Sequence, residues 1–142
     1  MGQDIFILLI EDSRSQALRF WLLLSCLGYQ VHLADDGKKG WQEACTRIPH
    51  LILLDLNLPS MNGFQVLERL KRNHSTADIP VLILSECDCD HEVQRARELG
   101  ANDYLFKRDF FRQDAAYQLE RAISQALPTE RKLSSYACPA SG

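Results

Sequence analysis

Four short apolar runs in this sequence each end in residues that can do chemistry. In chain order, Glu11 and Asp12 follow residues 5–10 (IFILLI), Asp55 follows 51–54 (LILL), Ser85 follows 81–84 (VLIL) and Lys107 follows 104–106 (YLF). If these runs are strands of one parallel sheet, their carboxyl ends meet at one edge, where ligands usually bind. Two carboxylates about 4 Å apart repel by about 4 kcal/mol at an effective dielectric near 20. Three such groups at one edge therefore call for a cation.

The side chains at this edge favour phosphoryl chemistry on a magnesium ion. Oxygen ligands supplemented by water suit Mg²⁺, which prefers one or two carboxylates and a phosphate. A carboxylate beside Mg²⁺ can attack a phosphoryl group and form an acyl phosphate. Such transfer needs positioning and positive charge around the phosphoryl oxygens. Lys107 can supply charge, and the Ser85 hydroxyl can donate a hydrogen bond to one oxygen.

The elements that must position these residues alternate between strand and helix. The apolar runs lack alternation, as in strands buried on both faces, and residues 31–34 (VHLA) read as a shorter edge strand. The alternation predicts an α/β fold, a flavodoxin-like doubly wound five-stranded parallel sheet of order 2-1-3-4-5 with helices on both faces.

Five helices are expected between and after the strands, each burying an apolar stripe. The first helix is capped by Ser13, ends at Gly28 and carries Ala17, Phe20, Trp21, Leu24 and Leu27, and the second begins near Lys38 and buries Trp41, Ala44 and Cys45. The third runs from Gly63 to about Asn73 through Val66, Leu67 and Leu70, and the fourth covers 91–99 before Gly100. The fifth buries Phe111, Ala115, Leu119, Ala122 and Ala126 and ends before Pro128.

Length and charge narrow the class of protein. The 142 residues suit one domain, expected over 1–127, with a flexible tail or linker remnant over 128–142. No apolar run approaches the roughly 20 residues of a membrane span, and no basic region precedes an early apolar one. We therefore expect a cytoplasmic protein without membrane contact. A net charge of −3 without clustered Lys and Arg argues against direct nucleic-acid binding.

The five cysteines are an odd number without framework spacing, so we expect free thiols. Residues 87–91 (CDCDH) invite a metal interpretation. Zinc sites usually separate paired cysteines by two to four residues and need a second ligand pair, which this sequence lacks. A polar loop with incidental thiols is the simpler interpretation.

One segment makes a family resemblance specific. Residues 55–63 (DLNLPSMNG) are similar to the D-x-x-x-P-x-M-[DN]-G loop of response-regulator receivers in two-component signalling. Glu11 and Asp12 before it, Ser85 after it and residues 100–107 (GANDYLFK) extend the resemblance to about 4–127. The whole resembles a single-domain receiver of the chemotaxis-regulator type.

The resemblance implies a role for each residue at the edge. Asp55 would be the phosphoacceptor, taking its phosphoryl group from a histidine kinase or a histidine phosphotransfer protein. The cofactor would be Mg²⁺, and Ser85 and Lys107 would contact the phosphoryl group. The metal ligands would be the side chains of Glu11, Asp12 and Asp55 and the backbone carbonyl of Asn57.

The resemblance also implies an output. Tyr104 would be the aromatic switch that turns inward on activation, and a downstream protein would read the face of helix 4, strand 5 and helix 5. Such a domain catalyses its own phosphorylation and dephosphorylation, and no multi-turnover activity is expected.

The chain departs from the family pattern at several positions. Glu86 follows Ser85 where a small residue is common, and we hypothesise that Glu86 restrains phosphotransfer. Arg108 replaces a common Pro, so no cis bond is expected there, and 108–112 is slightly longer than usual. Asp103 fits a charged dimer interface of the transcription-factor branch, but Tyr117 replaces the basic residue of helix 5. We do not expect that dimer.

Two alternatives stay open. A pseudo-receiver binds partners without phosphorylation; such domains usually lack an acidic or Lys position, and only Glu86 favours this option here. A phosphatase of the haloacid dehalogenase type also uses Asp, Ser or Thr, and Lys, but it needs a second Asp where Asn57 stands, and a cap domain.

Overall fold

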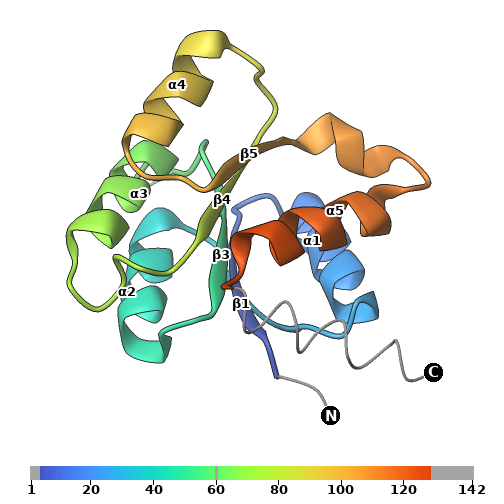
Figure 1. Ribbon diagram of the computed structural model, residues 1–142, viewed down its shortest axis with the longest axis horizontal. Coiled ribbons are helices and arrows are strands. Elements are labelled where there is room, and N and C mark those ends of the chain that lie inside the picture. Colours follow the sequence, from blue (N-terminus) through green and yellow to red (C-terminus); the bar gives the residue numbers. More distant parts are fainter. Residues whose placement is uncertain (1–3, 60, 129–142) are drawn as a thin grey trace.

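The alternating pattern folds into five parallel strands in the order β2-β1-β3-β4-β5 (Figure 1). This computed structural model describes residues 4–59 and 61–128. The predicted class and strand order are confirmed. The strands are β1 (Phe6–Ile10), β2 (Gln30–Ala34), β3 (Leu51–Asp55), β4 (Val81–Ser85) and β5 (Asp103–Phe106). The helices are α1 (Arg14–Cys26), α2 (Gly37–Arg47), α3 (Gly63–Arg72), α4 (Asp90–Glu98), the 3-10 helix η1 (Lys107–Phe111) and α5 (Ala115–Ala126).

Two hydrophobic cores flank the sheet. Helices α2, α3 and α4 cover one face, and α1 and α5 cover the other (Figure 1). In β1, Leu8 and Ile10 enter the first core, whereas Ile7 and Leu9 enter the second. This double burial explains why β1, β3 and β4 show no polar alternation, and the parallel arrangement brings their carboxyl ends to one edge.

Local signals set the helix ends that border this edge. The Ser13 side chain accepts a hydrogen bond from the Gln16 N–H and begins α1, as predicted. Asn62 and Gln65 form a reciprocal capping box at the start of α3. Gly28 has a φ of +93°, a left-handed conformation that ends α1 at little cost.

Two expected core aromatics are exposed, which corrects the predicted stripes. Trp21 is 37% exposed, because α1 turns Ala17, Phe20 and Leu24 inward. Phe111 is 65% exposed, and Phe110 is buried instead, 5.6 Å from the Phe20 ring centroid. The cause is η1, which occupies the expected start of the last helix and shifts the inward position by one residue.

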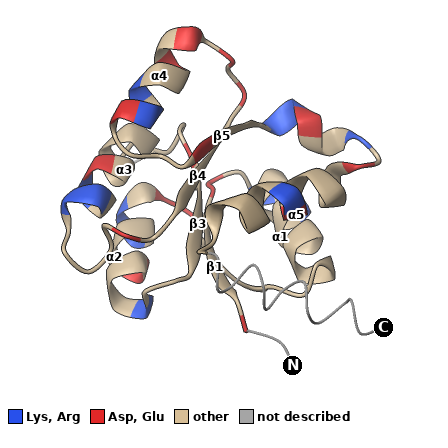
Figure 2. Ribbon diagram, viewed as in Figure 1, with Lys and Arg blue, Asp and Glu red and all other residues tan. Residues whose placement is uncertain are grey.

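The remaining expectations concern the chain end, a membrane span, the surface charge and the peptide bond at Arg108. The predicted tail lies outside the described residues, apart from Pro128. Among the described helices, none combines the length and the apolar character of a membrane span. Figure 2 shows acidic and basic residues interspersed over the helices in that view. No cis peptide bond occurs in the described part of the chain, as expected at Arg108.

Candidate functional site

Four neighbouring strands deliver their polar residues to one edge of the sheet, as the sequence indicates. Asp55 is the last residue of β3 and Ser85 the last of β4. Glu11 directly follows β1, and Lys107 directly follows β5. These four side chains are buried. An edge that is otherwise a packed apolar core thus contains a cluster of ionisable groups.

Three carboxylates gather at this edge. Glu11, Asp12 and Asp55 each offer an oxygen, and these oxygens lie within 4.8 Å of one another. Asp12 is exposed, whereas Glu11 and Asp55 are 2% exposed. The cluster is therefore accessible to solvent at Asp12, whereas the carboxylates of Glu11 and Asp55 are buried.

Lys107 is the positive partner of this cluster. Its Nζ lies 2.8 Å from Glu11 Oε1 and 3.2 Å from Asp55 Oδ1, and it donates to Gln16 Oε1 at 2.5 Å. Three carboxylates and one ammonium leave a formal charge of −2 when all four are ionised. A single lysine does not balance the site.

Burial shifts the protonation equilibria of the two buried acids. Burial raises the pKa of Glu11 to about 7, although Lys107 opposes the shift. Burial also raises the pKa of Asp55, and the Lys107 charge and the Asn57 N–H work against it. Loss of water around the charged form thus outweighs the nearby ammonium at both groups.

The donor set fits a hard divalent cation. All three cluster ligands are carboxylate oxygens, the type that Mg²⁺ prefers. Glu11 Oε1 is buried and has no aligned hydrogen bond beyond its ion pair with Lys107. The Asn57 N–H donates to Asp55 Oδ1 at 3.2 Å, while the role of its carbonyl as a metal ligand stays a prediction. A cation with a charge of +2 would balance the three acids and Lys107.

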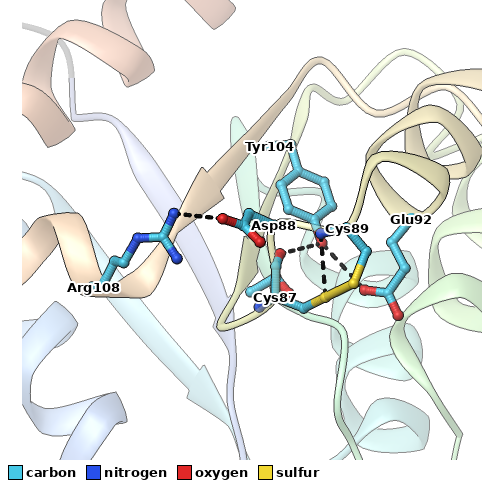
Figure 3. Close-up of a disulfide and its surroundings, with 7 residues drawn as sticks. Cys87, Asp88, Cys89, Glu92, Tyr104 and Arg108 are labelled. Carbon is cyan, nitrogen blue, oxygen red and sulfur yellow. Dashed lines mark hydrogen bonds and ion pairs between the residues drawn. A yellow bond between two sulfur atoms is a disulfide. The ribbon is translucent and has the colours of Figure 1, made fainter.

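The other predicted residues meet in the turn after β4. Ser85 Oγ accepts a hydrogen bond from the Cys87 N–H at 3.1 Å. Tyr104 is 7% exposed, and its hydroxyl donates to the Cys87 carbonyl at 3.1 Å (Figure 3). Burial raises the pKa of Tyr104. The predicted switch residue is therefore inward in this structure, and both it and Ser85 bond to the backbone of one residue.

Sequence analysis missed Gln16, which spans the mouth of the site. Its Oε1 accepts from Lys107, and its Nε2 donates to Glu86 Oε2 at 2.9 Å. Glu86, singled out as a departure from the family, is exposed and forms part of the same bridge. Gln16 lies in the first turn of the helix after Glu11, and that position was the available signal.

The free-thiol expectation is wrong for two cysteines. Cys87 and Cys89 form a disulfide, because the turn after β4 brings their Cα atoms to 5.6 Å, within the usual range. Cys26 and Cys45 are free, and Cys138 lies outside the described residues. With both sulfurs bonded to each other, the metal interpretation of 87–91 loses its thiolate ligands.

Comparisons with known proteins agree with this geometry. The sequence matches the family model of the response regulator receiver domain over residues 7–115. It is 33% identical over 101 residues to Protein PilH of Pseudomonas aeruginosa, covering 71% of this chain and 84% of PilH. It is 42% identical over 101 residues to the DNA-binding dual master transcriptional regulator RpaA of Synechocystis, covering 71% of this chain and 42% of RpaA. The chain thus spans less than half of that longer relative.

A solved structure shows the same resemblance in three dimensions. The receiver domain of sensor histidine kinase PA1611 from Pseudomonas aeruginosa PAO1 has a TM-score of 0.76 and 25% sequence identity. The match covers 89% of this chain and 98% of that one. That structure has a magnesium ion coordinated in its active site cleft.

Proposed function

The chain belongs to the response regulator receiver family, and we propose that Asp55 accepts a phosphoryl group from a phosphohistidine in a Mg²⁺-dependent reaction. The observation that carries the proposal is the buried cluster in which Lys107 lies between Glu11 and Asp55 with Asp12 beside them. The donor would be a histidine kinase or a histidine phosphotransfer protein, since receivers of this family interact with such kinases and with downstream effectors.

In the proposed reaction, one Asp55 carboxylate oxygen attacks phosphorus. The new P–O bond forms as the P–N bond to the donor histidine breaks, and the imidazole leaves with a proton. Mg²⁺, held by Glu11, Asp12, Asp55 and the Asn57 carbonyl, would supply positive charge to the phosphoryl oxygens. Lys107 adds the second positive charge, because its Nζ already lies 3.2 Å from Asp55 Oδ1.

Ser85 and Tyr104 convert the new group into a conformational signal. Ser85 Oγ accepts from the Cys87 N–H, and its own hydroxyl can rotate to donate to a phosphoryl oxygen. The aspartyl phosphate adds about −1.5 to −2 charge at pH 7. Phosphorylation then favours the state in which Tyr104 is inward, and a downstream protein reads the face of α4, β5 and α5. We propose the cytoplasm as the location, where ATP-dependent kinases present phosphohistidine.

Intact-mass spectrometry tests the proposal. Incubation with acetyl phosphate or phosphoramidate and Mg²⁺ should add one phosphoryl group to the wild type and none to Asp55→Asn. Asp78→Asn is the matched control, because Asp78 is exposed, and it should behave as wild type.

Other outcomes would contradict the proposal. A wild-type chain that gains no mass from either donor would behave as a pseudo-receiver. Steady turnover of p-nitrophenyl phosphate would instead indicate a phosphatase.

A further inference from the structure

We propose that Cys87 and Cys89 form a reversible thiol–disulfide site, reduced by dithiols and oxidised by disulfides, whose oxidised form strengthens phosphoryl binding at Asp55. The second half of this inference rests on the proposed function. The first half, the exchange reaction, does not.

The disulfide lies in the short segment that connects the phosphoryl pocket to the switch. Cys87 is two residues after Ser85, and its backbone bonds both to Ser85 and to Tyr104, the second of which Figure 3 shows. Its N–H donates to Ser85 Oγ at 3.1 Å, and its carbonyl accepts from the Tyr104 hydroxyl at 3.1 Å. Any movement of Cys87 therefore changes both contacts together.

The covalent ring restricts this movement. It contains the backbone of Cys87, Asp88 and Cys89, and the Cys89 N–H also donates to Cys87 Sγ at 3.2 Å. Cys89 is the N-cap residue of α4 and makes no side-chain cap hydrogen bond, so the disulfide is its side-chain attachment. Oxidation thus ties the start of α4 to the residue that holds Ser85 and Tyr104.

The site is open to a redox partner. Both cysteines are half-buried, and Glu86, Asp88 and Asp90 around them are exposed. Asp88 lies inside the ring and pairs with the exposed Arg108 at 2.9 Å, as Figure 3 shows. An exchanging sulfur can therefore approach without opening the core.

The exchange is a balanced two-electron reaction. A thiolate of a dithiol attacks one sulfur of the pair, the Cys87–Cys89 bond breaks, and a mixed disulfide forms. The second thiol of the reductant then attacks the mixed disulfide. The products are two protein thiols, which take up two protons, and one oxidised dithiol. A disulfide such as oxidised glutathione drives the reverse reaction and leaves as two thiols.

The proposed location makes reversibility the expected behaviour. Disulfides in the cytosol of mesophiles are usually transient and catalytic or redox-sensing, because thiol systems keep cysteines reduced. A structural role for a bridge across one intervening residue would also be small, since it closes a very short loop of the unfolded chain.

The contacts give the direction of the coupling. The oxidised ring holds the Cys87 backbone, which bonds both to the hydroxyl of the inward Tyr104 and to Ser85 Oγ. A pocket that is already arranged binds the phosphoryl group without first ordering the turn. Reduction frees the turn, so phosphoryl affinity should fall by about fivefold, the effect of one hydrogen bond.

The first arm of the test needs no phosphoryl group. The native full chain is treated with dithiothreitol or oxidised glutathione, denatured, alkylated with iodoacetamide and weighed. The reduced form should carry two more alkyl groups than the oxidised form, with the same result in Cys26→Ser/Cys45→Ser and no difference in Cys87→Ser/Cys89→Ser. Equal alkylation of both wild-type forms would overturn the site.

The second arm measures coupling with beryllofluoride and Mg²⁺ as the phosphoryl probe, by titration calorimetry on both forms. The oxidised wild type and the Cys26→Ser/Cys45→Ser control should bind about fivefold more tightly than their reduced forms, and Cys87→Ser/Cys89→Ser should not respond. Equal or reversed affinities would overturn the coupling. If neither form bound the probe, the coupling and the proposed function would both fall, while the exchange site would stand on the first arm.

Discussion

Two buried carboxylates at the end of the sheet compete for the single ammonium group of Lys107. Its Nζ is within 3.2 Å of both Glu11 and Asp55, yet burial still raises the pKa of each acid. This balance makes the protonation of the two acids depend on pH.

The pKa of Glu11 predicts how stability depends on pH in the absence of divalent cations. Glu11 titrates near 7 in the folded protein against an ordinary value of 4.5, so the folded state holds a proton that the unfolded chain has released. The free energy of unfolding should therefore fall as pH rises from about 4.5 to 7, by about 1 to 3 kcal/mol. Urea unfolding in EDTA, repeated at several pH values over this range, measures the free energy of unfolding.

Glu11→Gln should flatten that dependence, because the amide does not titrate. Asp55, whose pKa is also raised, would contribute the slope that persists in this variant. Glu98→Gln, on an exposed residue of α4, is the control and should keep the wild-type curve. A wild-type stability that is level over the window would contradict the prediction.

Glu86 is expected to slow phosphorylation. Its carboxylate lies at the mouth of the site and is held there by Gln16, so it should repel anionic phosphodonors. Glu86→Ala should speed phosphorylation by acetyl phosphate about two- to tenfold, which corresponds to a repulsion on the order of 1 kcal/mol. Rates from intact mass over time provide the measurement. Unchanged phosphorylation and dephosphorylation rates in Glu86→Ala would refute the idea, and Glu98→Ala should match the wild type.

The ends of the buried strands were predictable because a parallel strand that is buried on both faces is a continuous apolar run. The helix caps at Ser13 and the end at Gly28 followed from local backbone chemistry. The structure of the corner between β5 and α5 could not be predicted in this way, since Phe110 and Phe111 are adjacent and equally apolar. Which of the two enters the core depends on η1 and on contact with Phe20, neither of which periodicity reveals.

In the candidate site, the residues at the strand ends were predictable, whereas Gln16 and the disulfide were not. Residues that end strands were found because topology alone brings them together. Gln16 was missed because its role depends on a side-chain reach from α1 to Lys107. The disulfide was missed because a spacing of one residue closes only in a particular turn, and the sequence does not specify that turn.

Gly63 packs against the backbone of the phosphoacceptor loop. It begins α3, and an added Cβ would lie 2.5 Å from the Asp55 carbonyl oxygen and from Leu56 Cα. Both are backbone atoms that support the phosphoacceptor, so Gly63→Ala should destabilise the fold by about 1 to 3 kcal/mol and slow phosphorylation. Urea unfolding and intact mass would show the two effects.

Gly28→Ala is the matched control. A Cβ at Gly28 meets nothing within 4 Å, but the φ of +93° makes alanine costly there, by about 1 to 2 kcal/mol. This variant should lose stability and keep the phosphorylation rate. Equal rates in the two variants would mean that Gly63 does not position Asp55.

For the whole molecule, cation binding and folding are linked. If Mg²⁺ binds the folded cluster and not the unfolded chain, it should stabilise the protein by about 1.4 kcal/mol at ten times its Kd. Thermal unfolding with increasing Mg²⁺ should show a rising Tm for the wild type. Asp12→Asn should weaken that response, whereas Asp78→Asn should preserve it. A rise of the same size in Asp12→Asn would indicate binding elsewhere.

The long separation in sequence between Lys107 and the acids that it pairs with has a consequence for synthesis on the ribosome. Glu11 emerges early, but the lysine that faces it follows 96 positions later, after all five strands. A nascent chain that stops before β5 would have to bury two acids with no internal counter-charge, a costly arrangement. Chains truncated before β5 should therefore fail to pack the edge where β1 and β3 end.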